Sequence, residues 1–182
     1  MKIKKAFFAF ACLLVIIASF LVLPKLAIAS GYFGEYLFGT DGNYHAASLR
    51  IESDKKILKR FKRQTVSISV DTQNDTINAV QAVINFDPRK VRVDEINIEK
   101  TFCNHGLFLE KSKDNNLGEV RVACGLFNPG FSGDGVVVEL ELTPLRRGDF
   151  SLNFSPECMV LANDGLGTEV LSFVYNGVFR AN

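Results

Sequence analysis

The segment from Ile77 to Val93, INAVQAVINFDPRKVRV, constrains the fold more than any other part of this chain. Apolar and polar residues alternate along it, stop at Asp87-Pro88, and then alternate again. A period of two is typical of half-buried β-strands, because successive side chains point to opposite faces of a sheet. Proline cannot donate a hydrogen bond to a neighbouring strand. The segment therefore predicts two sequential strands joined by a turn at Asp87-Pro88.

Similar short apolar runs continue along the chain, and no segment keeps a helical period. Gly, Asn, Asp and Pro separate the runs, and these residues suit turns because Gly and Asn accept positive φ and Pro fixes φ. The fold class expected is all-β, a two-sheet jelly-roll β-sandwich of about nine strands. We expect strands at residues 47–52, 66–70, 77–86, 91–98, 119–124, 136–142, 150–154 and 171–179.

The strand expected at residues 77–86 has two distinct faces. Ile84 and Phe86 are large and apolar, so we expect them to point into the core together with Val80 and Ala82. The opposite face is then a flat, mildly apolar surface that suits a docked partner, or an ordinary solvent face. The candidate partner-binding residues on that outer face are Gln81, Val83 and Asn85.

The N-terminus resembles an export signal. MKIKK is followed by uncharged residues 6–23 and by an Ala-x-Ala site at Ala27 and Ala29. The apolar stretch also reaches the lower limit for a membrane-spanning helix, roughly 27 Å at about 1.5 Å per residue. We therefore expect one hydrophobic helix in residues 1–29, as a cleaved signal peptide or a membrane anchor. Both alternatives place residues 30–46, a linker, and the domain at 47–182 outside the cytoplasm, secreted or at the cell surface.

Cysteine usage agrees with export. Cys103 and Cys124 lie next to separate expected strands, and we predict a disulfide between them. In the chain-entropy model, a loop of about 22 residues gives about 3 kcal/mol of stabilisation. Free buried thiols and a metal site are the alternatives, but no CxxC motif occurs and His105 offers only one further ligand. Cys158 remains as a small buried residue.

Charge is distributed unevenly along the chain. Residues 64–182 contain 10 Lys/Arg and 16 Asp/Glu, a net charge of −6, which argues against nucleic acid as a partner. Residues 55–63, KKILKRFKR, form a basic run. This run is either a solvated turn between strands or a region that attracts anionic headgroups, wall polymers or an acidic partner.

An ordered series of segments resembles cohesin modules of bacterial surface and secreted proteins. The segments are VSISV at 66–70, INA at 77–79, INFDP at 84–88, the strands at 118–122 and 135–142, and ANDG at 162–165. The resemblance covers about residues 47–180 and implies a nine-stranded jelly roll related to carbohydrate-binding modules. It implies a non-catalytic scaffolding module that docks a dockerin-bearing protein through one sheet face and needs no cofactor or metal. Gln81 matches the position at which cohesins contact dockerin.

Two other functions compete with this interpretation. An enzyme is disfavoured because His45 and His105 are the only histidines and neither stands in a nucleophile, phosphate-loop or metal-ligand motif. A carbohydrate-binding module that recognises polysaccharide would share the fold. However, such modules stack sugars on rows of Trp or Tyr, and this chain has no Trp and places only Tyr175 within the domain.

Overall fold

The computed structural model describes residues 46–73 and 75–182, which form an all-β domain with one short 3₁₀ helix, η1 (Phe102–His105). The predicted leader and nearly all of the linker lie outside the described residues. No helix within the described part has the length and apolar character needed to cross a membrane. The strands are β1 (Ala47–Glu52), β2 (Ile57–Leu58), β3 (Gln64–Asp71), β4 (Ile77–Phe86), β5 (Val91–Asn97), β6 (Leu107–Asp114), β7 (Glu119–Gly125), β8 (Asp134–Pro144), β9 (Gly148–Phe154), β10 (Met159–Ala162), β11 (Leu171–Tyr175) and β12 (Gly177–Ala181).

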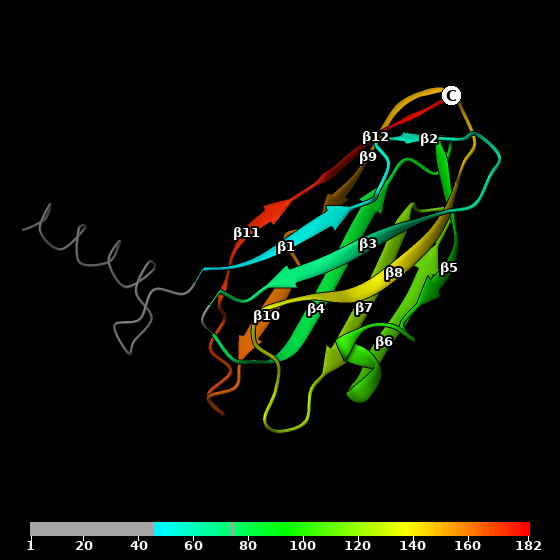
Figure 1. Ribbon diagram of the computed structural model, residues 1–182. Coiled ribbons are helices and arrows are strands. Elements are labelled where there is room, and N and C mark those ends of the chain that lie inside the picture. Colours follow the sequence, from blue (N-terminus) through cyan, green and yellow to red (C-terminus); the bar gives the residue numbers. More distant parts are fainter. Residues whose placement is uncertain (1–45, 74) are drawn as a thin grey trace, which may run out of the picture. The chain divides into compact units, whose positions relative to one another are not determined.

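Two mixed sheets pack face to face (Figure 1). One sheet has five strands in the order β11-β1-β3-β8-β5. The other has seven strands, in the order β2-β12-β9-β4-β7-β6, with β10 also paired to β4. The β-sandwich expected from the alternation is therefore confirmed.

The core lies between the two sheets and is built from the apolar face of each strand. In β4 the inward residues are those that the alternation predicts, since Val80, Ala82, Ile84 and Phe86 are all buried. β8 supplies Leu140 and Leu142, both fully buried. Burying a large aliphatic side chain stabilises the fold by about 1.5–3 kcal/mol, so these inner faces hold the sheets together.

The described domain has twelve strands and not about nine, because β2, β6 and β10 were not foreseen and the segment expected as one strand at 171–179 forms two. β6 has the sequence LFLEKSKD and is an edge strand, so its side chains need little burial and leave a weak apolar pattern. β2 is only two residues long and lies inside the basic run, where buried Leu58 anchors it. Part of that run is thus a paired strand as well as a turn.

The single strand expected at 171–179 is wrong. The chain changes sheets at Asn176, so that β11 pairs with β1 in one sheet and β12 pairs with β9 in the other. A Cβ atom at Gly177 would lie 2.6 Å from Ile51 Cγ2, which explains the absence of a side chain at this crossing. The Asn176 side chain fixes the crossing because its Oδ1 accepts a hydrogen bond from the Phe154 N–H at 2.9 Å.

The predicted disulfide between Cys103 and Cys124 is confirmed, with their Cα atoms 5.9 Å apart. It joins η1 to β7 and closes off the stretch that contains β6. Cys158 is a free, buried thiol, as expected.

A buried carboxylate links β5 to its neighbours. The Asp94 side chain is 5% exposed and receives Arg92 Nε at 2.7 Å and Thr143 Oγ1 at 2.5 Å, with Arg63 Nε at 3.8 Å. Burial raises the pKa of Asp94, but the Thr143 hydrogen bond and the two arginines outweigh it and lower the pKa below its usual value. The ionised carboxylate therefore stabilises the fold.

Replacing this carboxylate gives a pH-dependent prediction. We expect Asp94→Asn to lower the free energy of unfolding by about 1–3 kcal/mol at pH 7. Because the folded-state pKa is depressed, the contribution is complete above the unfolded pKa of about 3.9 and is lost as the pH falls through the folded-state value. Urea unfolding from pH 7 down to pH 2 should show the difference from wild type shrinking, whereas exposed Asp54→Asn should change little. A difference that stays constant with pH would contradict this account.

Candidate functional site

The outer face of the seven-stranded sheet carries the predicted partner-binding residues of β4. Asn85 is exposed, and its neighbours across the sheet are Glu119 on β7 and Asn153 on β9. Gln81 is half-buried, and its Nε2 donates a hydrogen bond to the Glu157 carbonyl oxygen at 2.7 Å. Gln81 thus holds a neighbouring segment in place as well as lining the face.

Val83 is not at the surface, contrary to the expectation for the outer face of β4. It is fully buried because Ser155–Cys158, the segment between β9 and β10, covers it. The Ser155 N–H donates to the Val83 carbonyl oxygen at 2.8 Å. The Val83 N–H lies 3.3 Å from Cys158 Sγ, which in turn lies 3.4 Å from the Val83 carbonyl oxygen. The Val83 side chain is therefore inaccessible to a docked partner, because a segment more than 70 residues later in the chain lies against it.

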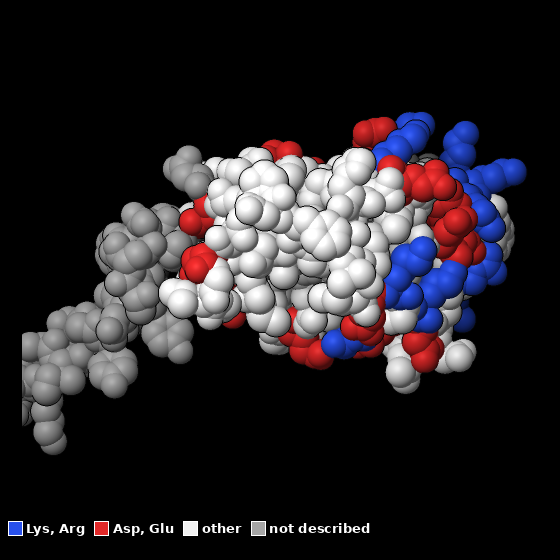
Figure 2. All heavy atoms as spheres, turned by 90° about the horizontal axis from the view of Figure 1, so that it is seen from below, with Lys and Arg blue, Asp and Glu red and all other residues white. Residues whose placement is uncertain are grey.

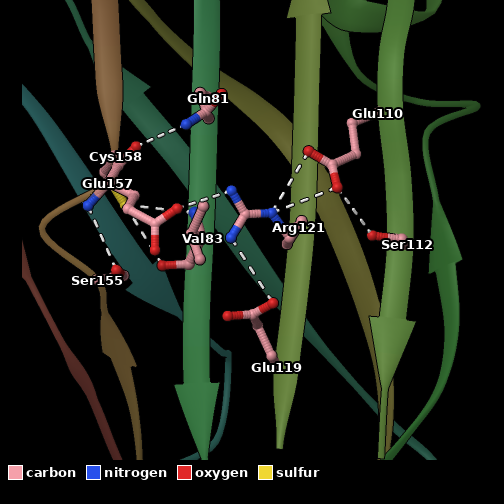
Figure 3. Close-up of polar contacts among 9 residues, drawn as sticks. All are labelled: Gln81, Val83, Glu110, Ser112, Glu119, Arg121, Ser155, Glu157 and Cys158. Atoms are coloured by element: carbon pink, nitrogen blue, oxygen red, sulfur yellow. Dashed lines mark hydrogen bonds and ion pairs between the residues drawn. The ribbon is translucent and has the colours of Figure 1, made fainter. Parts of the chain in front are cut away.

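Three carboxylates surround one guanidinium on this face. Arg121 of β7 lies 2.8 Å from Glu157, 3.3 Å from Glu110 and 3.7 Å from Glu119, measured between nitrogen and oxygen. The pair with Glu157 reaches across β4 beside Val83, and Ser112 of β6 donates to Glu110 at 3.2 Å (Figure 3). The cluster fastens the Ser155–Cys158 segment to β7 and connects β7 with β6.

The cluster leaves the face with excess negative charge. The hydrogen bond to Glu157, with the charges of Glu157, Glu110 and Glu119, raises the pKa of Arg121, which therefore stays charged. One cation facing three anions leaves carboxylate oxygens available to an incoming positive group. The face is polar and acidic around this cluster, which suits contact with a protein surface that carries positive charge.

Sequence reasoning did not find Arg121, Glu110, Glu119 or Glu157. The alternation of β7 does turn Glu119 and Arg121 away from Val120 and Val122, so their exposure was visible in the sequence. Their meeting with residues of β6 and of the β9–β10 connection depends on strand order, which alternation does not encode.

The Cys158 thiol is buried against the Val83 backbone. Burial raises the pKa of the Cys158 thiol, so it remains protonated and hydrogen-bonded to the Val83 backbone. It behaves as a small apolar residue of the core.

The outer face of the five-stranded sheet has a different character. A hollow of about 750 Å³ lies over β1, β3 and β8 and is lined by Ser67, Ser69 and Glu139 among others. Phe173 and Tyr175 lie on β11, an edge strand of this sheet, and both are about half exposed. Among the described residues, no group of three His, Cys, Asp or Glu side chains is arranged to hold a metal ion.

Comparison by sequence finds no matching family model and no matching curated protein. Comparison by structure does find similar proteins. One is a non-cellulosomal cohesin from the hyperthermophilic archaeon Archaeoglobus fulgidus, with 15% identity and a TM-score of 0.60 over 75% of this chain and 91% of that one.

Two further solved structures show the same relation. A type I cohesin–dockerin complex from Clostridium thermocellum matches with 15% identity and a TM-score of 0.61, over 75% of this chain and 99% of that one. A type II cohesin domain from the cellulosome of Acetivibrio cellulolyticus matches with 14% identity and a TM-score of 0.59, over 74% of this chain and 95% of that one. The domain therefore has the cohesin fold, as the ordered sequence segments predicted.

Proposed function

We propose that this protein is a non-catalytic module that docks a partner protein, of the dockerin type, on the outer face of its seven-stranded sheet. The observation that carries the proposal is the acidic surface built around Arg121 by β6, β7 and the β9–β10 connection of a cohesin fold. The solved complex from Clostridium thermocellum provides a precedent for dockerin binding by this fold.

The chemistry of the face indicates what the partner presents. Glu110, Glu119 and Glu157 offer carboxylates at its centre, and Asn85 offers an exposed amide beside them. A partner surface with Lys or Arg side chains can compete for these carboxylates, and charge complementarity of this kind increases the association rate and the specificity. Gln81 and Arg121 hold the face rigid, so little conformational entropy is lost when the partner binds.

We also propose that the domain acts outside the cytoplasm. The leader expected in residues 1–29 would deliver the domain outside the cytoplasm, by secretion or by anchorage in the membrane. The three carboxylates of the face all pair with Arg121, and no two of them are arranged as a general acid and a general base. We therefore assign the module to binding and scaffolding.

The proposal is tested by changing the face without disturbing the fold. Asn85 is exposed, so Asn85→Arg should fold normally while placing a bulky cation opposite the cations of the partner. We expect the full chain to bind a member of a panel of dockerin-bearing proteins, and Asn85→Arg to weaken that binding at least tenfold, about 1.4 kcal/mol, in a calorimetric or surface-based titration. Thr65→Arg, on exposed Thr65 of β3 in the other sheet, is the matched control and should bind as wild type does.

Two outcomes would contradict the proposal. Equal losses in the Asn85 and Thr65 variants would remove the seven-stranded sheet as the docking face. Retention of the full chain on insoluble cellulose or chitin, with no binding to any dockerin-bearing protein in the panel, would instead favour the polysaccharide alternative and point to Phe173 and Tyr175.

A further inference from the structure

The basic run at residues 55–63 lies at one end of the sandwich and is joined there by other cations. The Arg60 N–H donates to the Asn182 carbonyl oxygen at 3.1 Å, and the Phe61 N–H donates to the Pro144 carbonyl oxygen at 2.9 Å. These bonds place the run beside the C-terminal strand and beside the turn between β8 and β9, which carries Arg146 and Arg147. Figure 2 shows Lys and Arg side chains gathered at one end of the domain, with Asp and Glu side chains among them, while a broad neighbouring area is uncharged.

Most cations at this end have no acidic partner. Arg63 pairs with Glu141, and Arg180 pairs with Asp149. Within residues 46–73 and 75–182, the remaining cations of these segments form no ion pair, although Lys56 and Arg60 lie over aromatic rings. The basic end is defined by these unpaired cations: Lys55, Lys56, Lys59, Arg60, Lys62, Arg146 and Arg147.

Two apolar side chains protrude among these charges. Ile57 is 56% exposed and lies between Lys56 and buried Leu58. Phe61 is 61% exposed and lies between Arg60 and Lys62. Phe61 has a φ of 57°, a left-handed conformation that is unfavourable for a bulky residue. The bond from its N–H to Pro144 holds it there. The backbone thus presents an aromatic ring to solvent at a cost in strain, a feature that gathers at functional sites.

We propose that the basic end is a docking surface for an anionic lipid bilayer. Cations clustered near a membrane are attracted to acidic headgroups, and exposed Phe and Ile side chains insert at the boundary between headgroups and acyl chains. A soluble polyanion would use the cations but would leave Ile57 and Phe61 in water. This inference goes beyond the proposed function, because β2 lies at the opposite edge of the seven-stranded sheet from β7 and β6, which carry the Arg121 cluster.

The length of the chain before the domain is compatible with this arrangement. Should the leader stay in the bilayer, the 17 residues of the linker at 30–46 could extend to at most about 58 Å at about 3.4 Å per residue. The longest strand of the domain, β8, has 11 residues and spans about 37 Å. The linker is therefore long enough for the basic end to reach the same bilayer.

The test measures how accessible the lysine side chains of the basic end are to a reagent in the full chain. The protein is reconstituted into vesicles of phosphatidylcholine alone or of phosphatidylcholine with phosphatidylglycerol, and the fraction that floats with the vesicles is treated with an amine-acylating reagent. We expect the anionic vesicles to slow acylation of Lys55, Lys59 and Lys62 at least fivefold, as measured by mass spectrometry. Exposed Lys111 of β6 is the internal control and should react equally in both vesicles.

Variants and competitors separate the alternatives. Arg146→Gln/Arg147→Gln, which keeps all three lysine probes, should remove most of the protection, and Phe61→Ser should reduce it as well. Equal acylation in neutral and anionic vesicles would overturn the inference. Stronger protection by inorganic polyphosphate in solution than by phosphatidylglycerol vesicles would overturn the assignment to lipid. Neither result would bear on the proposed docking face, because the Asn85→Arg measurement reports on that face independently.

Discussion

Replacing Cys103 and Cys124 together by serine is expected to lower the free energy of unfolding by about 3 kcal/mol under oxidising conditions. The disulfide joins residues that are 21 positions apart, and cutting it releases the unfolded chain from a closed loop. The loop contains β6, an edge strand with few buried side chains that pairs with β7 alone. Guanidinium unfolding followed by circular dichroism measures the change.

Two controls identify the disulfide as the cause. Addition of a reducing agent should destabilise the wild type to the level of the double variant and leave the double variant unchanged. Cys158→Ala removes a buried thiol without cutting a covalent link, and its effect should be the same with and without reductant. A wild type that is insensitive to reductant while its disulfide is demonstrably reduced would refute the prediction.

The substitution Gly118→Ala is expected to lower the free energy of unfolding by about 3 kcal/mol or more. Gly118 ends the turn between β6 and β7 with a φ of +77°, which a side chain disfavours by about 1–2 kcal/mol. An added Cβ would also lie 2.1 Å from the Phe86 carbonyl oxygen and 2.8 Å from Pro88 Cδ. The backbone would have to move, and the hydrogen bond from the Phe86 N–H to the Gly118 carbonyl oxygen, 2.8 Å long, would be disturbed.

Gly165→Ala provides the matched control for this prediction. Gly165 has a nearly identical φ of +75°, but no atom lies within 4 Å of an added Cβ. Its substitution should therefore cost only the left-handed strain, about 1–2 kcal/mol. The difference between the two variants in thermal or denaturant unfolding isolates the steric contact at Phe86. Equal effects would show that the turn beside Pro88 relaxes freely.

The faces of β4 illustrate what alternation can predict. Val80, Ala82, Ile84 and Phe86 are buried as expected, because two packed sheets bury every second residue of a central strand. Val83 breaks the pattern because Ser155–Cys158 returns to cover it after a long excursion of the chain. Burial by such a distant segment has no local signature, and therefore it could not be predicted from the strand itself.

The candidate site also contains residues that the sequence of one strand predicts and residues that it does not. Asn85 and Gln81 could be placed on the outer face from the sequence of one strand. The cluster around Arg121 could not, because it requires β6, β7 and the β9–β10 connection to meet in a specific order. The split of residues 171–179 did leave a local sign, since Asn176-Gly177 is a turn-forming pair inside an apolar run.

The arrangement of the first and last strands determines how the domain responds to a pulling force applied at its ends. Ala47 pairs with Leu171, whereas Ala181 pairs with Leu58, beyond the far end of β1 (Figure 1). A force that draws these two points apart acts along β1 and loads its hydrogen bonds to β3 and β11 simultaneously, in shear. Strands loaded in this way must slip as a unit, whereas a hairpin pulled open from one end loses its bonds one at a time. The domain is thus built to keep its shape when a load is transmitted along its length.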